Sequence, residues 1–293
     1  MLKRVLVTGK NGQLGLSIAK IAQDYPQYDM TFVGRDQLDL SQSQTIIEYF
    51  QSKTFNVIIN CAAYTAVDKA ESDPEIAIQV NYLAVKQMAQ IAKNQNAILI
   101  HISTDYVFNG KNHKPYVETD PVDPINLYGQ TKLKGEQSIY IIQPKGMVIR
   151  TSWLYSEFGD NFVKTMLRLG KERENLDVIY DQVGSPTFAG DLAKAIFDML
   201  SRPFQFGKES LQTFHFSNEG ICSWYDFAKT IFELSNIHCR VNPIETKDYP
   251  TPAKRPHYSV LNKLKIRQGY MLEISYWKDS LATCLNELEK IKR

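Results

Sequence analysis

Short apolar runs alternate with helical patterns through the first half of the chain. Runs rich in Ile and Val predict buried strands at residues 5–8, 30–33, 57–60, 97–103 and 147–151. Apolar positions spaced three or four residues apart predict helices at 16–22, 43–51, 74–94 and 127–142. Strands that alternate with helices form a parallel sheet covered on both faces. The pattern therefore predicts an α/β fold with a doubly wound parallel sheet.

After residue 156 the pattern becomes irregular and rich in Pro, Gly and aromatic residues. A helix at 190–200 and a strand at 213–217 have the character of late elements of the same sheet. We therefore expect residues 1–156 plus 188–217 to form the sheet domain. Residues 157–187 plus 218–293 are expected to form a smaller lobe over the C-terminal edge of the strands, where open α/β sheets bind ligands.

Composition narrows the range of partners. The chain of 293 residues is 43% hydrophobic and 23% charged, with a net charge of +2, which gives no reason to expect nucleic acid or an anionic membrane as partner. Its four cysteines lie far apart and the five histidines do not cluster, so we expect neither a metal site nor a disulfide framework. The first strand begins near residue 4 and no apolar run approaches ~18 residues, so we expect a cytoplasmic protein.

A glycine-rich loop joins the first predicted strand to the first predicted helix. The spacing is Gly-x-x-Gly-x-x-Gly, which differs from the Gly-x-Gly-x-x-Gly fingerprint of many Rossmann folds. A tight turn, close backbone approach and free amides at a helix N-terminus nevertheless suit a pyrophosphate. This placement predicts a Rossmann-like dinucleotide-binding domain whose contacts come from Gly9, Asn11, Gly12, Gln13 and Leu14.

The motif Tyr128-x-x-x-Lys132 predicts the chemistry. On a helix this spacing puts a phenol and an ammonium on one face, one turn apart. A nearby cation favours the phenolate, so we expect Lys132 to lower the phenol pKa and make Tyr128 a better proton donor. Thr104 stands at the C-terminal end of the predicted strand that begins at Ala97, and its hydroxyl is expected to face the ligand crevice. These three groups suit protonation of a carbonyl oxygen while a hydride reaches its carbon.

The glycine loop, a hydroxyl at a strand end and Tyr-x-x-x-Lys, in this order, resemble the extended short-chain dehydrogenase/reductase superfamily. Within it, longer motifs are similar to those of dTDP-4-dehydrorhamnose reductases. They are the stretches 62–71 (AAYTAVDKAE), 103–108 (STDYVF), 150–155 (RTSWLY), 181–187 (DQVGSPT), 217–220 (SNEG) and 255–256 (RP). The resemblance implies NAD(P)H-dependent reduction of the 4-keto group of dTDP-4-dehydro-L-rhamnose to give dTDP-L-rhamnose. The C-terminal lobe would then bind the sugar nucleotide.

The resemblance also implies site residues. Tyr128 would protonate the C4 oxygen, Thr104 would polarise the ketone, and Lys132 would also bind the nicotinamide ribose. Further cofactor contacts would come from Asp39, Leu40, Ala62, Ala63, Tyr64 and Thr65. Substrate contacts would come from Val67, Asp68, Lys69, Asp105, Tyr106, Trp153 and Arg255.

Three of these assignments keep a simpler alternative, and a fourth depends on charge alone. Asp39 could only cap the helix that begins near Ser41. Lys69 could be a surface charge and Trp153 a core residue. For Arg255, only its positive charge supports binding of the diphosphate.

The end of the second strand bears on cofactor preference. A carboxylate about 20 residues past the glycines normally selects NAD by bonding the ribose 2′-hydroxyl. Here the strand ends in Gly34-Arg35-Asp36. Gly34 leaves room for a phosphate and Arg35 offers a planar cation, so we expect NADPH to be preferred and NADH also to be accepted. Asp36 is the alternative ribose acceptor.

Two other functions remain open. A nucleotide-sugar epimerase would retain NAD and return the hydride to the same sugar, but no acidic residue directly ends the second strand. A non-catalytic regulatory subunit is disfavoured by the intact Thr104, Tyr128 and Lys132. Sugar-nucleotide dehydratases of the superfamily follow the threonine with Asp-Glu, an acid and a base for eliminating water, whereas Tyr106 follows Asp105 here and the base is missing. Some relatives form magnesium-bridged dimers through glutamates, one of them in the first helix. No equivalent carboxylate cluster can be placed in this chain, so we expect no metal and a monomer or weak homodimer.

Overall fold

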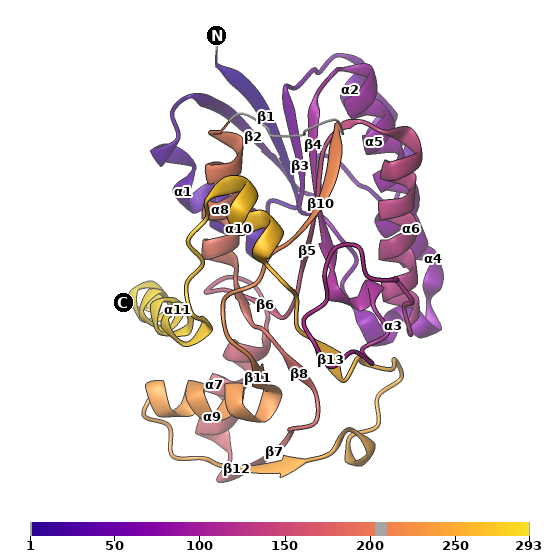
Figure 1. The fold of residues 1–293 in the computed structure, drawn as a ribbon. Coiled ribbons are helices and arrows are strands. Elements are labelled where there is room, and N and C mark those ends of the chain that lie inside the picture. Colours follow the sequence, from indigo (N-terminus) through magenta and orange to yellow (C-terminus); the bar gives the residue numbers. More distant parts are fainter. Residues whose placement is uncertain (1, 203–209, 293) are drawn as a thin grey trace.

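The computed structural model describes residues 2–202 and 210–292, and its centre is a six-stranded parallel sheet (Figure 1). The strand order is β10-β5-β4-β3-β1-β2. Their bounds are β1 Lys3–Thr8, β2 Tyr28–Val33, β3 Val57–Asn60, β4 Ile98–Thr104, β5 Lys145–Thr151 and β10 Leu211–His215. The predicted strands are confirmed: the inner strands are largely buried on both faces of the sheet, while the edge strand β2 is only partly buried. The Rossmann-like α/β prediction is confirmed with them.

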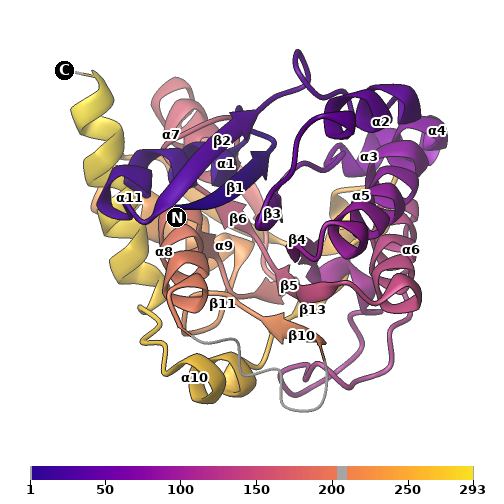
Figure 2. The same cartoon turned by 90° about the horizontal axis from the view of Figure 1, so that it is seen from above.

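Two layers of helices cover the sheet, as the view from above shows (Figure 2). One apolar core lies between the sheet and α2 Ser43–Gln51, α5 Ala84–Asn94 and α6 Leu127–Ile142. The other lies between the sheet and α1 Gln13–Ile21, α8 Ala189–Leu200 and α10 Leu264–Tyr270. The predicted helix at 74–94 is present in three pieces: α4 Pro74–Ile78, a π-helical turn Gln79–Leu83, and α5. The helix predicted at 16–22 begins earlier, at Gln13.

The order of strands creates a switch point between β1 and β3. From β1 the chain runs to β2 on one side, and then crosses to β3 on the other. Loops that leave neighbouring strands in opposite directions open a crevice at their carboxyl ends. The glycine loop after β1 and residues 61–65 after β3 flank this crevice.

A third apolar core organises the irregular second half of the chain. It joins α7 Phe162–Glu172, α9 Trp224–Leu234 and α11 Trp277–Lys292. Small sheets complete this part: β7 Asn175–Ile179 with β12 Arg240–Ile244, and β8 Val183–Gly184 between β11 Cys222–Ser223 and β13 Tyr258–Ser259. β6 Leu154–Tyr155 pairs with β9 Thr187–Phe188. Figure 1 shows these elements together below the main sheet.

The division into a sheet domain and a lobe stays a prediction. Two details bear on it. Ile266 and Tyr270 of α10 belong to the core under the sheet, although sequence placed them in the lobe. Residues 203–209 of the predicted segment 188–217 lie outside the described residues.

Candidate active site

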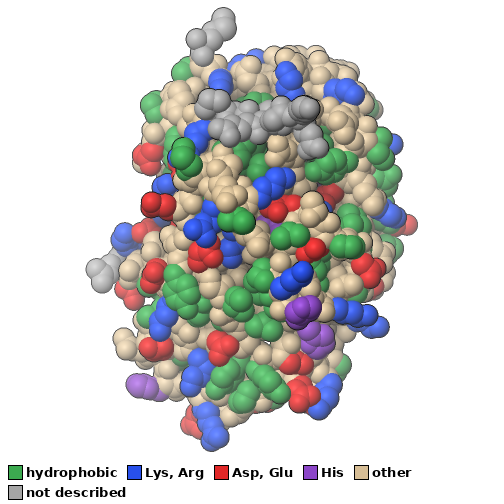
Figure 3. All heavy atoms as spheres, in the orientation of Figure 1, with side chains coloured by type: hydrophobic (Ala, Val, Ile, Leu, Met, Phe, Trp, Pro, Cys, Tyr) green, Lys and Arg blue, Asp and Glu red, His purple; other side chains and the backbone are tan. Residues whose placement is uncertain are grey.

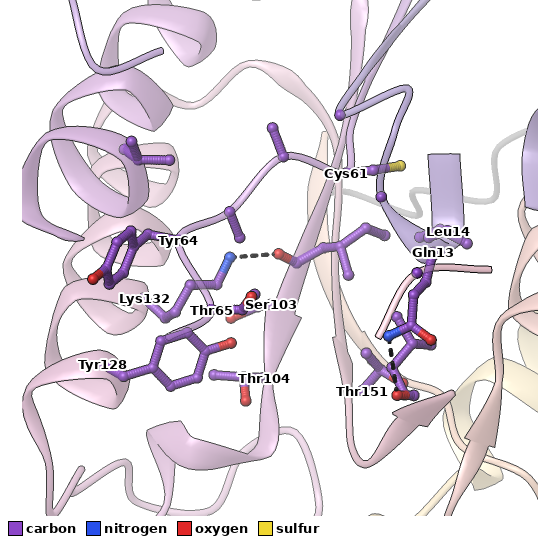
Figure 4. Close-up of a pocket in the computed structure, with 18 of the residues that line it drawn as sticks. Gln13, Leu14, Cys61, Tyr64, Thr65, Ser103, Thr104, Tyr128, Lys132 and Thr151 are labelled. Carbon is purple, nitrogen blue, oxygen red and sulfur yellow. Dashed lines mark hydrogen bonds between the residues drawn. The ribbon is translucent and has the colours of Figure 1, made fainter. Parts of the chain in front are cut away.

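A cleft of about 990 Å³ lies at the C-terminal edge of the sheet. Most of the predicted site residues line it, and Figure 4 shows several of them facing the same space. From the predicted cofactor set these are Gly9, Asn11, Gly12, Gln13, Leu14, Arg35, Asp39, Leu40, Ala62, Ala63, Tyr64 and Thr65. From the catalytic and substrate sets they are Val67, Thr104, Asp105, Tyr106, Tyr128, Lys132, Trp153 and Arg255. Asp68 and Lys69 are not in the lining.

The glycine loop has the geometry of a pyrophosphate cradle. Gly9 has φ +72°, and a Cβ there would lie 2.9 Å from the backbone nitrogen of Ala62, so a side chain would be strained and crowded. Gly12 caps α1 without a side-chain hydrogen bond, and no acidic residue stands in the first turn. The N-terminus of α1 therefore faces the cleft, and no acidic side chain in its first turn offsets the positive end of the helix dipole. These residues fit a dinucleotide.

Gln13 connects this loop to the second half of the chain. Its Nε2 donates to the carbonyl oxygen of Leu154 at 3.3 Å, the dashed line beside Gln13 in Figure 4. Its Oε1 accepts from Ser156 Oγ at 3.0 Å and from Asn161 Nδ2 at 2.9 Å. With its side chain used in this way, Gln13 would contact a ligand through its backbone.

Asn81 is a site-supporting residue that sequence reasoning missed. It lies in the π-helical turn, 1% exposed, and holds both the N–H and the carbonyl of Tyr64 at 2.9 and 3.0 Å. Its Nδ2 also reaches Thr131 Oγ1 on α6 at 3.2 Å. π-helical turns are frequent at functional sites. The available signal was a lone Asn on an otherwise apolar helix face, between Ala77 and Ala84.

The structure brings Thr104, Tyr128 and Lys132 together. Asn126 begins α6 by accepting a hydrogen bond from the Gly129 amide at 2.8 Å. A Cβ at Gly129 would lie 2.2 Å from the Tyr106 carbonyl oxygen, so glycine is what lets α6 approach the end of β4. Figure 4 shows the Tyr128 ring pointing from α6 toward Thr104, with Lys132 one turn further along.

Burial dominates the electrostatics of this group. It raises the pKa of Tyr128 to about 12, against the opposing effect of a hydrogen bond with Thr104. Lys132 is 1% exposed; its Nζ donates to the Ile102 carbonyl oxygen at 2.7 Å, and burial lowers its pKa to about 8. The expected lowering of the phenol pKa is not seen in this structure, where burial has the largest effect, and a contribution from Lys132 stays a prediction. The consequence is a tyrosine that stays protonated at neutral pH.

At the end of β2, the structure separates Arg35 from Asp36. Lys10 draws the Asp36 carboxylate into an ion pair at 3.1 Å, and Asp36 is not among the cleft-lining residues. Arg35 lines the cleft and is 75% exposed, with its Nε 3.4 Å from Asp39 Oδ2. Asp39 Oδ1 accepts from the Ser41 amide and hydroxyl at 2.9 and 2.7 Å. Asp39 thus closes a turn before α2 and also lines the cleft beside Leu40.

Two of the predicted substrate residues, Asp68 and Arg255, form an ion pair. Asp68 on α3 Val67–Ser72 binds Arg255 at two points, 2.6 and 3.0 Å, and the pair tethers α3 to residues 253–255. Arg255 lines the cleft with its charge already paired, and this pair holds the pKa of Asp68 below its usual value. Lys69 is exposed on α3.

Asp105 and Tyr106 follow β4 directly. Burial raises the pKa of Asp105 to about 6, although the Thr104 hydroxyl donates to its Oδ1 at 3.1 Å. The Tyr106 ring meets Tyr128 edge to face, with centroids 5.6 Å apart. Burial raises the Tyr106 pKa, so its hydroxyl also stays protonated at neutral pH.

An aromatic stack forms part of the wall of the cleft. Trp153 stacks on Trp224 with ring centroids 3.6 Å apart and planes within 11°, and Phe162 packs against Trp224 at 4.6 Å. All three line the cleft. Trp153 was predicted, whereas Trp224 and Phe162 were not, because they come from helices distant in sequence that only the fold brings together.

The described residues contain no helix long and apolar enough to cross a membrane. They also contain no group of three or more His, Cys, Asp or Glu side chains arranged to hold a metal ion.

Comparison with known proteins gives one consistent result. The family described as the RmlD substrate binding domain matches residues 3–290. The dTDP-4-dehydrorhamnose reductase of Aggregatibacter actinomycetemcomitans is 40% identical over 287 residues, 96% of this chain and 97% of that protein. A dTDP-4-dehydrorhamnose reductase structure from Clostridium acetobutylicum is similar with TM-score 0.90 and 41% identity, over 98% of this chain and 99% of that one. The Bacillus anthracis enzyme, solved in complex with NADP, has TM-score 0.90 and 38% identity, over 98% and 100%.

Proposed function

This chain belongs to the RmlD substrate-binding-domain family, and on that premise we propose that it is an NADPH-dependent dTDP-4-dehydrorhamnose reductase. The reaction is reduction of the 4-keto group of dTDP-4-dehydro-L-rhamnose to give dTDP-L-rhamnose. One observation carries the proposal: a single cleft contains both the glycine cradle and the group formed by Thr104, Tyr128 and Lys132.

In this proposal the reduced nicotinamide supplies the hydride, and the protein supplies the proton. Tyr128 donates its phenolic proton to the C4 oxygen as the hydride arrives, and burial keeps the phenol protonated until then. With substrate bound, the Thr104 hydroxyl would turn its single hydrogen from Asp105 Oδ1 to the same oxygen and so stabilise the negative charge that develops there. Lys132 would bind the nicotinamide ribose, and its ammonium form would stabilise the phenolate that remains on Tyr128 after the proton has been given up.

The cofactor preference follows from the end of β2. Arg35 faces the cleft and is free enough to pair with a ribose 2′-phosphate, while Lys10 removes Asp36 from competition. We therefore assign NADPH as the preferred cofactor, with NADH also accepted.

The substrate is assigned to the opposite half of the cleft. Val67, Tyr106, Trp153 and Arg255 line it between α3, the end of β4 and the aromatic stack. The stack offers a flat apolar surface, and the Asp68–Arg255 pair leaves a guanidinium edge for an anionic group. On the face in Figure 3, basic and acidic side chains are interspersed, in keeping with a small-molecule substrate. We also propose a monomer or weak homodimer.

The test is to mix purified protein with dTDP-4-dehydrorhamnose and NADPH and to follow absorbance of the reduced nicotinamide. The proposal expects one NADPH oxidised per sugar reduced, with Tyr128→Phe as the inactive control. Conversion of the sugar without net NADPH consumption would instead identify an epimerase. Absence of turnover with any dTDP-4-keto sugar, with cofactor binding intact, would favour a regulatory subunit.

A further inference from the structure

Three polar side chains cross the sheet in one row behind Lys132. Thr8 on β1 is paired in register with Asn60 on β3, and Asn60 is paired with His101 on β4. They are 1%, 1% and 0% exposed. Two residues earlier, the same strands place Leu6, Ile58 and Leu99 in the apolar core. Burying polar groups on such a face costs free energy unless they are hydrogen-bonded, so the row needs an explanation.

The hydrogen bonds along the row have a defined direction. The Ala62 amide donates to Thr8 Oγ1 at 3.3 Å, which leaves the Thr8 hydroxyl hydrogen for Asn60 Oδ1. Their separation of 2.6 Å suits an O–H···O bond and is short for N–H···O. The amide of Asn60 is thereby oriented, and its Nδ2 faces His101 Nδ1 at 3.0 Å. Nδ2 can only donate, so Nδ1 is the acceptor.

This direction decides where the hydrogen of His101 lies. Burial holds the His101 pKa well below its ordinary value, so the imidazole is neutral and carries one hydrogen. With Nδ1 accepting from Asn60, that hydrogen is on Nε2. Nε2 faces Lys132 Nζ at 3.4 Å. An ammonium has only donors, so an N–H directed at it is unfavourable, whereas a neutral amine has a lone pair that accepts it.

We propose that His101 is a positioning residue for the reaction: Thr8 and Asn60 hold it as the Nε2–H tautomer, and that hydrogen opposes protonation of Lys132. While Nε2–H approaches the lone pair, Nζ keeps its donation to the Ile102 carbonyl oxygen at 2.7 Å. Lys132 is then poised to exchange a proton near neutral pH rather than to remain a permanent cation. The catalytic meaning of this exchange rests on the proposed reductase function.

The other ionisable groups around Lys132 do not oppose its protonation as the His101 hydrogen does. Glu136, on the same helix, favours the ammonium, but it is committed to a buried ion pair with Arg150 at 2.7 Å. Tyr128 on α6 and Cys61 after β3 both stay neutral, because burial raises the pKa of each. Burial itself lowers the Lys132 pKa to about 8, and the His101 hydrogen acts in the same direction.

The test measures the lysine directly. Lys132 is titrated by NMR in protein labelled with ¹³C-lysine, in wild type and in His101→Gln, whose side-chain oxygen can accept from an ammonium. We expect the midpoint of Lys132 to rise by about one pH unit in the variant, a tenfold change in the ratio of ammonium to amine. The alkaline limb of the kcat/KM profile should move with it. His215→Gln is the matched control, because His215 is also 0% exposed and lies on β10, bonded to the Tyr116 carbonyl oxygen.

¹⁵N-histidine NMR reads the tautomer independently. A hydrogen on Nδ1 of His101 would overturn the proposal, as would an unchanged Lys132 midpoint in a folded His101→Gln protein. If that variant does not fold, Thr8→Val removes the hydroxyl that orients Asn60 with little change of shape, and a raised midpoint is again expected. Both NMR measurements need no turnover, so failure of the proposed function would not be confused with failure of this inference.

Discussion

Replacing the buried Lys132 with methionine should make the protein more stable while removing its activity. Burial lowers the Lys132 pKa from 10.5 to about 8, a shift of 2.5 units (10.5 − 8). At ~1.36 kcal/mol per unit, the charged lysine costs about 3 kcal/mol of unfolding free energy at pH 7. Methionine has a similar shape and no charge, but loses the hydrogen bond to the Ile102 carbonyl, worth ~1 kcal/mol. The net expectation is stabilisation by about 2 kcal/mol.

The gain in stability of Lys132→Met over wild type should also depend on pH. The folded-state pKa lies below the unfolded one, so between pH 8 and 10.5 the unfolded chain holds a proton that the folded chain has lost. The penalty is fully present below pH 8 and is relieved as pH rises through this window. The advantage of Lys132→Met over wild type should therefore be largest at pH 7 and shrink toward pH 10.

Urea denaturation at pH 7 and pH 9.5, followed by tryptophan fluorescence, measures both effects. Lys134→Met is the matched control, because Lys134 lies on the exposed face of the same helix. Surface changes of this kind are usually within about 0.5 kcal/mol. A Lys132→Met protein that is less stable than wild type at pH 7, or whose advantage does not change with pH, would refute the reasoning.

The remaining predictions concern catalysis and cofactor choice. Tyr128→Phe should lower kcat by ~10²–10⁴-fold with cofactor binding preserved in a fluorescence titration, and a kcat above about a tenth of wild type would contradict its role as proton donor. Thr104→Val should lower kcat more than it raises KM in steady-state assays, because the hydroxyl acts where charge develops; an unchanged kcat with a raised KM would make it a ground-state binding residue. Arg35→Ala should reduce kcat/KM for NADPH and leave NADH nearly untouched; an equal response of both cofactors would leave Arg35 without a role and favour Asp36.

The alternation of apolar runs and helical patterns was enough to predict the sheet and most of its helices. Parallel strands are buried on both faces, so their sequences are nearly continuous Ile and Val, and the ends of β3, α2 and α6 fell where the pattern placed them. The glycine loop, Thr104 and the Tyr128–Lys132 pair were also readable, because each needs a particular residue at a particular place in a strand or helix.

Residues that depend on contacts between distant segments could not be found in this way. Trp224 reaches the cleft only because α9 packs beside α7, and Asn81 matters through its bonds to Tyr64 and Thr131. The pKa values of Tyr128 and Lys132 depended on tertiary structure even more. A helical spacing suggested that Lys132 would lower the phenol pKa of Tyr128, but it carried no information on how deeply both groups are buried.

The sequence by itself thus determined the fold class and predicted the cofactor loop and the reacting groups, because these are encoded locally by residue type and spacing. Only the tertiary structure decided how those groups are charged and which partners hold them. Removing water raises the Tyr128 pKa and lowers that of Lys132. The row from Thr8 to His101 exists only because three strands far apart in sequence pair in one register, and desolvation and register are both properties of the folded chain.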